Sequence, residues 1–419
     1  MNINRAFCAQ LRQVRLRHTM ANPLIPTEML LSAWLRHHLF ILGFDKLKLH
    51  AYKKLSSLIS QGGGGVIKNV VFDMSLFVKR EWNNNLDLLQ HVAPDLTLNL
   101  NMLDFKWFYI SVGYMMLTQP ESKVELLTDK VVNFYLDLGG GHLLLDAPIG
   151  NTEKQILKLA AKYYKSVKIN YRALYDPNLD PRFITVGEGT SAVTICLPDL
   201  PKINSKHLLA KALLHKELYR AVFLVDHPFC QSLMRQNISI NRSALNVIRY
   251  DLLFLDGLGD FFLATESSEF LYKFRSLKPY SEDASFGKKT YTLLKTILAT
   301  NTLLLRLAVA YNLHTALDDN IVSGLLNDSY IPYISSGMVS NDPLVMKYEE
   351  EFVADYFEQY VGALYLEQPE VAKEWINILF ERILFLISDS YKVIHRRRKL
   401  LASHYDYRAW SVDVIGRSI

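Results

Sequence analysis

The sequence predicts a mainly α-helical protein of two or three domains. Apolar residues recur at helical spacing along most of the 419-residue chain, whereas strand-like segments are confined to residues 139–196. Half of the residues are hydrophobic and 21% are charged, so the chain can bury sizeable cores. The length suits more than one domain.

Composition narrows the classes of function. No apolar run reaches the length of a membrane span, so no membrane partner is expected. Three cysteines, Cys8, Cys196 and Cys230, lack paired spacing, which supports neither a disulfide framework nor a zinc site. The formal net charge of +5 permits a nucleic-acid partner without demonstrating one.

Residues 1–23 form a basic N-terminal segment. Four arginines precede the first acidic residue, Glu28. Two interpretations stand: a presequence that directs the chain to mitochondria, which we favour slightly, and a plain basic arm, with a nuclear location as the alternative.

Residues 352–367 predict an amphipathic helix that carries Asp355 and Glu358 three positions apart, and therefore on one face. Asp256 and Asp260 lie four apart in a second apolar segment. Either pair alone is most simply a solvated helix face. Two such pairs together predict a divalent-metal site, since hard cations such as Mg2+ take oxygen ligands.

These motifs carry a family resemblance that covers 197–386. Asp256-Gly-Leu-Gly-Asp260 resembles the signature of ribonuclease III, in which an acid-x-Leu-Gly-Asp core opens a long helix, and 354–366 resembles that family's second acidic helix. Residues 299–313 resemble its connecting helix, and 208–216 its opening helix. The likeness is greatest to the yeast type. One departure is Asp256, which stands where the family has Glu.

The resemblance implies a mechanism and a partner. Asp256, Asp260, Asp355 and Glu358 would hold Mg2+, with Asp260 and Glu358 as the catalytic pair. The substrate would be double-stranded or structured RNA, cut by hydrolysis in a valley between two paired domains during RNA processing.

An internal repeat supplies the second domain. Residues 24–138 follow the motif order of 197–386, with Gly43 in register with Gly259 and Gly113 with Gly362. In that register Phe40, Phe44, Lys106 and Tyr109 replace Asp256, Asp260, Asp355 and Glu358. We therefore expect two ribonuclease III-like helical domains that form a pseudo-dimer within one chain, only one of them bearing acids. A dimer of two whole chains is the alternative.

The segment 139–196 between the copies allows two interpretations. A helix over 152–165 and strands over 170–175 and 182–186, paired around Asp176-Pro-Asn, resemble the front of a double-stranded-RNA-binding domain. A third strand over 193–197 stands where the closing helix is expected, so a small αβ linker is equally favoured. Within the C-terminal copy, 276–289 and 318–347 predict loops.

Basic residues predict RNA contacts. The C-terminal region 387–419 contains a dense run beside tyrosines and a tryptophan, a combination suited to RNA backbones and bases. A solvated helix end is the alternative. The residues expected to touch RNA are His215, Lys216, Arg396, Arg397, Arg398 and Lys399.

A non-catalytic function is the rival hypothesis. Some mitochondrial large-ribosomal-subunit proteins are similar in fold to ribonuclease III and lack its acids, and they bind ribosomal RNA and ribosomal proteins. The acid-free first copy, the basic N-terminus and the shorter Asp256 suit that alternative. The four acids of the second copy favour a nuclease, which we prefer narrowly.

Overall fold

The computed structural model describes residues 33–60, 77, 80–81, 105–118, 120–138, 150–176, 182–186, 193–277, 288–338 and 340–399. This part of the chain is mainly helical, which confirms the predicted class. The N-terminal helices are α3 (Ala33–Ser60), α6 (Phe105–Thr118), α7 (Glu121–Leu138), α8 (Asn151–Ser166) and α9 (Tyr171–Tyr175). The strands are β1 (Lys168–Ile169), β2 (Phe183–Val186), β3 (Val193–Cys196) and β4 (Leu317–Asp318).

The C-terminal part contains further helices. They are α10 (Lys206–Leu213), the 3-10 helix η4 (Lys216–Phe223), α11 (Pro228–Arg235), α12 (Arg242–Leu277), α13 (Lys288–Leu298), α14 (Asn301–Ala310), the 3-10 helix η6 (Leu313–Thr315), α15 (Asn320–Leu325), the π-helix η7 (Leu326–Tyr330), α16 (Pro332–Ser336), α17 (Pro343–Glu367) and α18 (Pro369–Lys399). No helix in the described part of the chain combines the length and apolarity that a membrane span requires.

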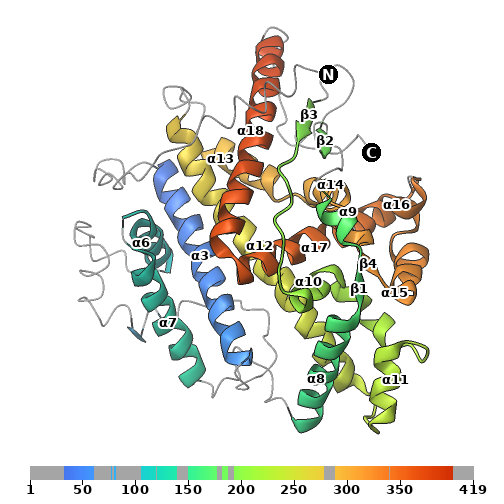
Figure 1. Cartoon of the computed structure of the whole chain (residues 1–419). Helices are drawn as coiled ribbons and strands as arrows, with labels where there is room; N and C mark the ends of the chain where they lie inside the picture. Colours follow the sequence, from blue (N-terminus) through green and yellow to red (C-terminus); the bar gives the residue numbers. More distant parts are fainter. Residues whose placement is uncertain are drawn as a thin grey trace.

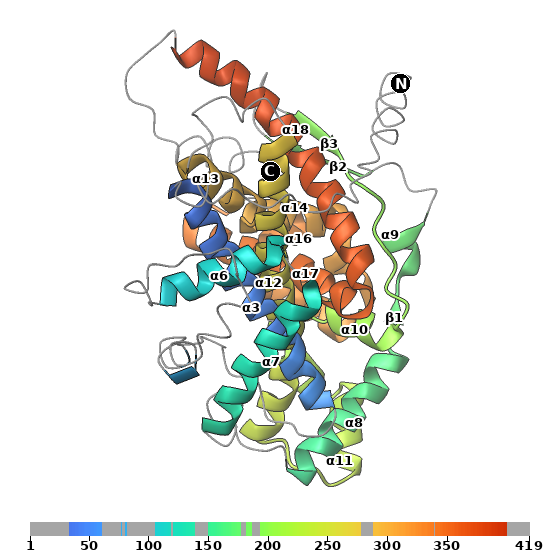
Figure 2. The same cartoon turned by 90° about the vertical axis from the view of Figure 1, so that its left-hand side faces the viewer.

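Four helices form a row across the molecule. α6 packs on α3, α3 on α12 and α12 on α17, so α3 and α12 lie side by side in the middle of the row (Figure 1, Figure 2). α12 is one continuous helix of 36 residues. The family resemblance implied that a long helix opens at Asp256. Asp256 instead lies in the middle of α12, because the apolar stretch before it is helical too.

Glycines allow α3 and α6 to touch backbone to backbone. A Cβ added at Gly43 would lie 2.0 Å from the carbonyl oxygen of Tyr109, and one at Gly113 would lie 2.0 Å from that of Leu39. No side chain fits at either position, because Cβ atoms do not approach other heavy atoms so closely.

The α12–α17 crossing repeats this geometry. A Cβ at Gly259 would lie 1.9 Å from the carbonyl oxygen of Glu358, and one at Gly362 would lie 2.1 Å from that of Leu255. Each of these residues is the counterpart, in the register found in the sequence, of a residue at the first crossing. The two helix pairs therefore cross at equivalent points.

α3 and α12 run antiparallel. His38 stacks on Tyr272 with ring centroids 5.0 Å apart, and Tyr52 stacks on Phe254 at 5.7 Å. Between these ends, Lys46 Nζ lies 3.0 Å from Glu269 Oε1. Residue numbers rise along one helix as they fall along the other.

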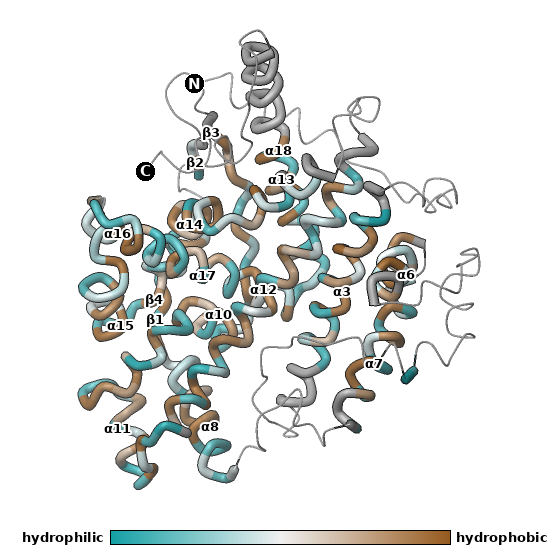
Figure 3. Tube along the Cα trace, turned by 180° about the vertical axis from the view of Figure 1, so that it is seen from behind, coloured by the Kyte–Doolittle hydropathy of each residue, from teal (hydrophilic) through white to brown (hydrophobic). Residues whose placement is uncertain are grey.

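α8 shows why the sequence pattern predicts a helix at 152–165. Its buried residues recur at helical spacing, namely Ile156, Leu159, Ala160 and Tyr164. Teal and brown accordingly alternate along its tube in Figure 3. The apolar side of α8 packs on α10, α11 and α12.

The segment between the repeats departs from prediction. The strand predicted over 170–175 is wrong: only Lys168 and Ile169 form β1, and the side chain of Asn170 caps the short helix α9 by accepting from the Ala173 amide. β1 pairs with β4, whereas β2 and β3 pair with each other. The strands over 182–186 and 193–197 are confirmed, but the predicted pairing around Asp176-Pro-Asn does not form.

The loop predicted over 318–347 is also wrong in large part, because α15, η7, α16 and the start of α17 occupy it. The loop predicted over 276–289 falls mostly outside the described residues. So do residues 1–23, the linker at 139–149 and the counterpart of the connecting helix in the first copy.

Candidate metal centre

Three of the four predicted acids come together where α12 and α17 cross. Carboxylate oxygens of Asp256, Asp355 and Glu358 all lie within 4.8 Å of one another. The contact between Gly259 and the backbone of Glu358 holds the two helices close enough for this. The spacing of acids on each helix was visible in the sequence, and the crossing converts two pairs into one cluster.

Asp260, the fourth predicted ligand, lies outside this cluster. Its side chain is exposed one turn beyond Asp256. Its charge still reaches Glu358, whose pKa is raised well above the usual range by burial and then by Asp256 and Asp260. Asp260 therefore borders the cluster instead of completing it.

Lys216 bridges two of the three clustered acids. Its Nζ lies 2.7 Å from Oδ2 of Asp256 and 2.9 Å from Oδ2 of Asp355. Burial disfavours the ammonium, but the two carboxylates outweigh burial and raise the pKa of Lys216. The predicted RNA-contact residue is thus committed to the acids, and only 18% of its side chain is exposed.

His215 is buried completely, and its contact with RNA stays a prediction. Its ring stacks on Phe352 with centroids 3.7 Å apart. Nδ1 accepts the Glu217 amide proton at 3.0 Å, which leaves the ring proton on Nε2, 3.2 Å from Oδ2 of Asp355. Burial lowers the pKa of His215, so a neutral imidazole lies beside Asp355.

The cluster suits a divalent cation. Burial raises the pKa of Asp256 to about 7, whereas for Asp355 burial is outweighed by His215 and Lys216, which lower its pKa. Asp256 is 7% exposed, and its Oδ1 has no hydrogen-bond partner among the described residues. An unpaired buried carboxylate oxygen is costly, and a hard cation would satisfy it.

Aromatic side chains lie at the α3–α6 crossing, where the predicted repeat places the counterparts of the acids. Tyr109 meets Phe40 and Phe44 edge to face, with ring centroids 5.5 and 5.1 Å apart. Lys48 places its Nζ 4.0 Å from the centroid of Phe44. In the register predicted from the sequence these rings are the counterparts of Asp256, Asp260 and Glu358. The side chain of Lys106, the fourth counterpart, lies outside the described residues.

The C-terminal basic run belongs to α18, which continues to Lys399. The structure does not describe its side chains beyond residue 384. Contact between RNA and Arg396, Arg397, Arg398 or Lys399 therefore stays a prediction.

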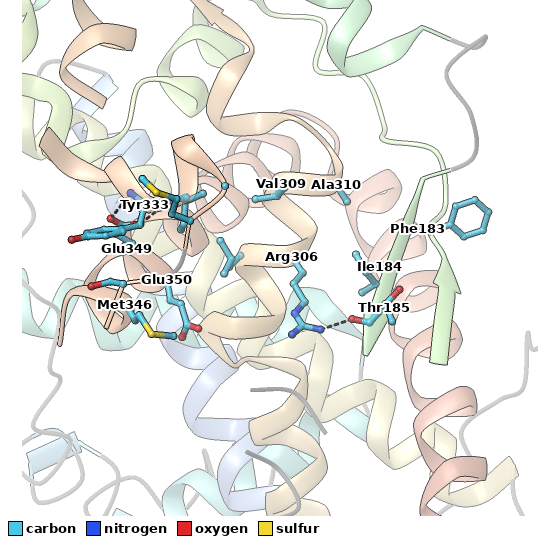
Figure 4. Close-up of a pocket in the computed structure, with 15 residues that line it drawn as sticks. Phe183, Ile184, Thr185, Arg306, Val309, Ala310, Tyr333, Met346, Glu349 and Glu350 are labelled. Carbon is cyan, nitrogen blue, oxygen red and sulfur yellow. Dashed lines mark hydrogen bonds between the residues drawn. The ribbon is translucent and has the colours of Figure 1, made fainter. Parts of the chain in front are cut away.

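A pocket of about 360 Å3 lies between β2, α14 and α17 (Figure 4). Arg306 donates to the carbonyl oxygen of Thr185 on one side of it. Glu349 accepts from the amides of Tyr333 and Ile334 at 3.1 and 2.9 Å on the other side. These polar groups are used internally, and the pocket shares no lining residue with the acid cluster.

Comparison with known proteins gives no relative. No family model matches the chain, and no curated protein or solved structure matches it either. What defines the candidate site is its own chemistry: three converging carboxylates, a lysine that bridges two of them and a buried histidine beside Asp355.

Proposed function

We propose that the protein is an endoribonuclease of the ribonuclease III type that cleaves double-stranded RNA with Mg2+. One observation carries the proposal: acids from the two motif helices converge at a glycine crossing. The spacing within each helix did not require that convergence, since two solvated faces would have pointed apart.

The same proposal makes the chain an intramolecular pseudo-dimer. Its support is the equivalence of the two glycine crossings and the antiparallel packing of α3 on α12. Self-complementary contacts about a two-fold axis generate that kind of pairing. Because rings replace the acids of the first copy, a bound duplex would be cut on one strand per binding event.

Each residue has a role in this proposal. Asp256, Asp355 and Glu358 would hold the ion, and Asp260 would add negative charge at its open side. Bound Mg2+ supplies an activated water and charge stabilisation at the phosphate. The buried ring of His215 would flank Asp355, with Nε2 3.2 Å from Oδ2. The duplex would be recognised by shape, phosphates and 2′-hydroxyls, with the basic run of α18 as a candidate contact.

A second candidate function is an inactive RNA-binding component of the mitochondrial large ribosomal subunit, in contact with ribosomal RNA and proteins. Lys216 favours it, since an ammonium already balances two of the acids. The basic segment 1–23 agrees with a mitochondrial location, with a nuclear location as the alternative.

Cleavage of a long RNA duplex distinguishes these functions. The purified chain should cut the duplex when Mg2+ is present and stay inactive with a chelator. A single-stranded RNA of equal length serves as the control and should survive. Binding of the duplex without any cleavage over a range of Mg2+ concentrations would reject the nuclease and favour the scaffold.

A further inference from the structure

We propose that Lys216 is a built-in cation that competes with the divalent ion, so that the ion enters the cluster only when the ammonium withdraws. The inference rests on the proposed function, because it concerns how the same site is regulated. In the observed arrangement the ammonium of Lys216 would neutralise the acids and block the ion.

The contacts of Lys216 show the competition. Nζ binds Oδ2 of Asp256 and Oδ2 of Asp355 at 2.7 and 2.9 Å. An ion bound to those two oxygens would lie against the ammonium, and two cations in contact repel. Mg2+ sits about 2.0–2.1 Å from its oxygen ligands, and Nζ lies 2.7 and 2.9 Å from the same two oxygens, so an ion on either oxygen would lie within about 5 Å of the ammonium and be repelled by it.

An unused ligand atom shows that the ammonium does not satisfy the cluster. Oδ1 of Asp256 has no hydrogen-bond partner among the described residues although the side chain is 7% exposed. Glu358 adds a third carboxylate within 4.8 Å. One ammonium with three donors serves two oxygens here, whereas a divalent ion accepts more oxygen ligands and carries twice the charge.

Withdrawal of the ammonium requires little else to move. Lys216 begins η4, and 18% of its side chain is exposed, so the four-carbon stem has a route to solvent. His215, the preceding residue, stays fixed because its ring stacks on Phe352 and its Nδ1 accepts the Glu217 amide proton. His215 therefore remains beside Asp355 when the ammonium leaves.

Metal binding to Lys216→Met tests the competition. Methionine keeps length and apolar contact but removes the charge. Without metal the variant should melt below wild type, because three carboxylates then lack a cation. Added MgCl2 should restore its melting temperature. Half of the effect should occur at a concentration at least about tenfold below that for wild type, because the ion no longer displaces an ammonium that binds two carboxylates.

Lys211→Met is the matched control. Lys211 Nζ lies 2.6 Å from Oδ1 of Asp251, and its side chain is 11% exposed, so it forms an equally buried pair away from the cluster. This variant should melt lower without any gain in Mg2+ response. Asp355→Asn added to Lys216→Met should abolish the gain.

Each outcome decides the inference. Equal Mg2+ midpoints for wild type and Lys216→Met would overturn it. If Lys216→Met fails to fold without metal, recovery on refolding with MgCl2 supports competition and failure to recover overturns it. The nuclease is judged separately. Tighter Mg2+ binding by the variant, without RNA cleavage by wild type, rejects the nuclease alone. RNA cleavage by wild type with unchanged Mg2+ midpoints rejects the competition alone.

Discussion

Asp355 is the residue that connects every part of the acid cluster. It faces Lys216, His215 and the other carboxylates at once. Asp355→Asn removes a ligand and a charge with little change in volume, so cleavage should fall by orders of magnitude while duplex binding persists. Gel assays of cleavage and of binding measure the two effects. Glu351→Gln, at an exposed position of the same helix, should leave both unchanged.

Glu266 gives the fold a dependence on pH. It is 1% exposed on α12, and burial, then repulsion by Glu269, raises its pKa to about 7. The folded state therefore binds a proton more tightly than the unfolded state, so this group contributes stability at low pH that is lost as pH rises from about 4.5 to 7.

Glu266→Gln removes that titration. The variant should match wild type near pH 4.5 and be more stable at pH 8, by on the order of 3 kcal/mol. Urea unfolding at both pH values measures the difference. A stability difference that stayed constant across this pH window would show that Glu266 does not titrate as inferred.

The sequence predicted the acids better than their surroundings. Asp256, Asp355 and Glu358 follow from spacing on two helices, because periodicity fixes which face a residue occupies. Lys216 was assigned to RNA, and His215 with it, since a basic residue about one turn beyond a helix gives no local sign that it folds back onto two acids. That contact exists only after α10 and η4 pack against α12 and α17.

At the scale of elements, the glycine crossings are the constraint most open to test. Gly259→Ala would force a Cβ against the carbonyl oxygen of Glu358, and helix backbones cannot yield as a side chain can. We expect a loss at or above the upper end of the roughly 1–3 kcal/mol typical of overpacking. Urea unfolding followed by circular dichroism measures it.

Gly324→Ala is the natural control for that substitution. A Cβ at Gly324 meets nothing within 4 Å, and the position lies in α15, so alanine should be neutral or slightly stabilising through helix propensity. Equal losses at Gly324 and Gly259 would show that the crossing is not the cause.

Long helices were predictable because their apolar residues keep one period over several turns. The helices within 318–347 were not predicted, because the Asp, Asn, Ser and Pro residues of this region indicate a loop. In the structure such residues start helices: Asp319 accepts from two amides at the start of α15, and Asp342 caps α17 ahead of Pro343. Cap residues and loop residues are the same types, so composition alone does not separate them.

At the scale of the whole molecule, α3 and α12 join the two helix pairs. Tyr52 is buried between Phe254 and Phe261, with ring centroids 5.7 and 5.1 Å away. Tyr52→Ala should lower stability by about 3–5 kcal/mol, as expected for loss of a large buried ring, and should separate the unfolding of the two pairs into two transitions. Calorimetry detects the separation.

Leu126→Ala provides the comparison, because Leu126 is 60% exposed on α7. It should change neither the midpoint nor the number of transitions. A single shifted transition for Tyr52→Ala would mean that contacts elsewhere are enough to couple the pairs.

The two glycine crossings also show that the packing of a helix pair does not depend on the acidic side chains of the candidate metal centre. The α3–α6 pair packs with phenyl and phenol rings where the α12–α17 pair has carboxylates, yet both approach backbone to backbone at the same points. The same helix crossing thus accommodates either aromatic or charged side chains. The fold would therefore assemble without an ion at the acid cluster, unlike a zinc finger, which needs its zinc to fold. Mutation of the acids would then remove the metal-dependent activity and leave the fold intact.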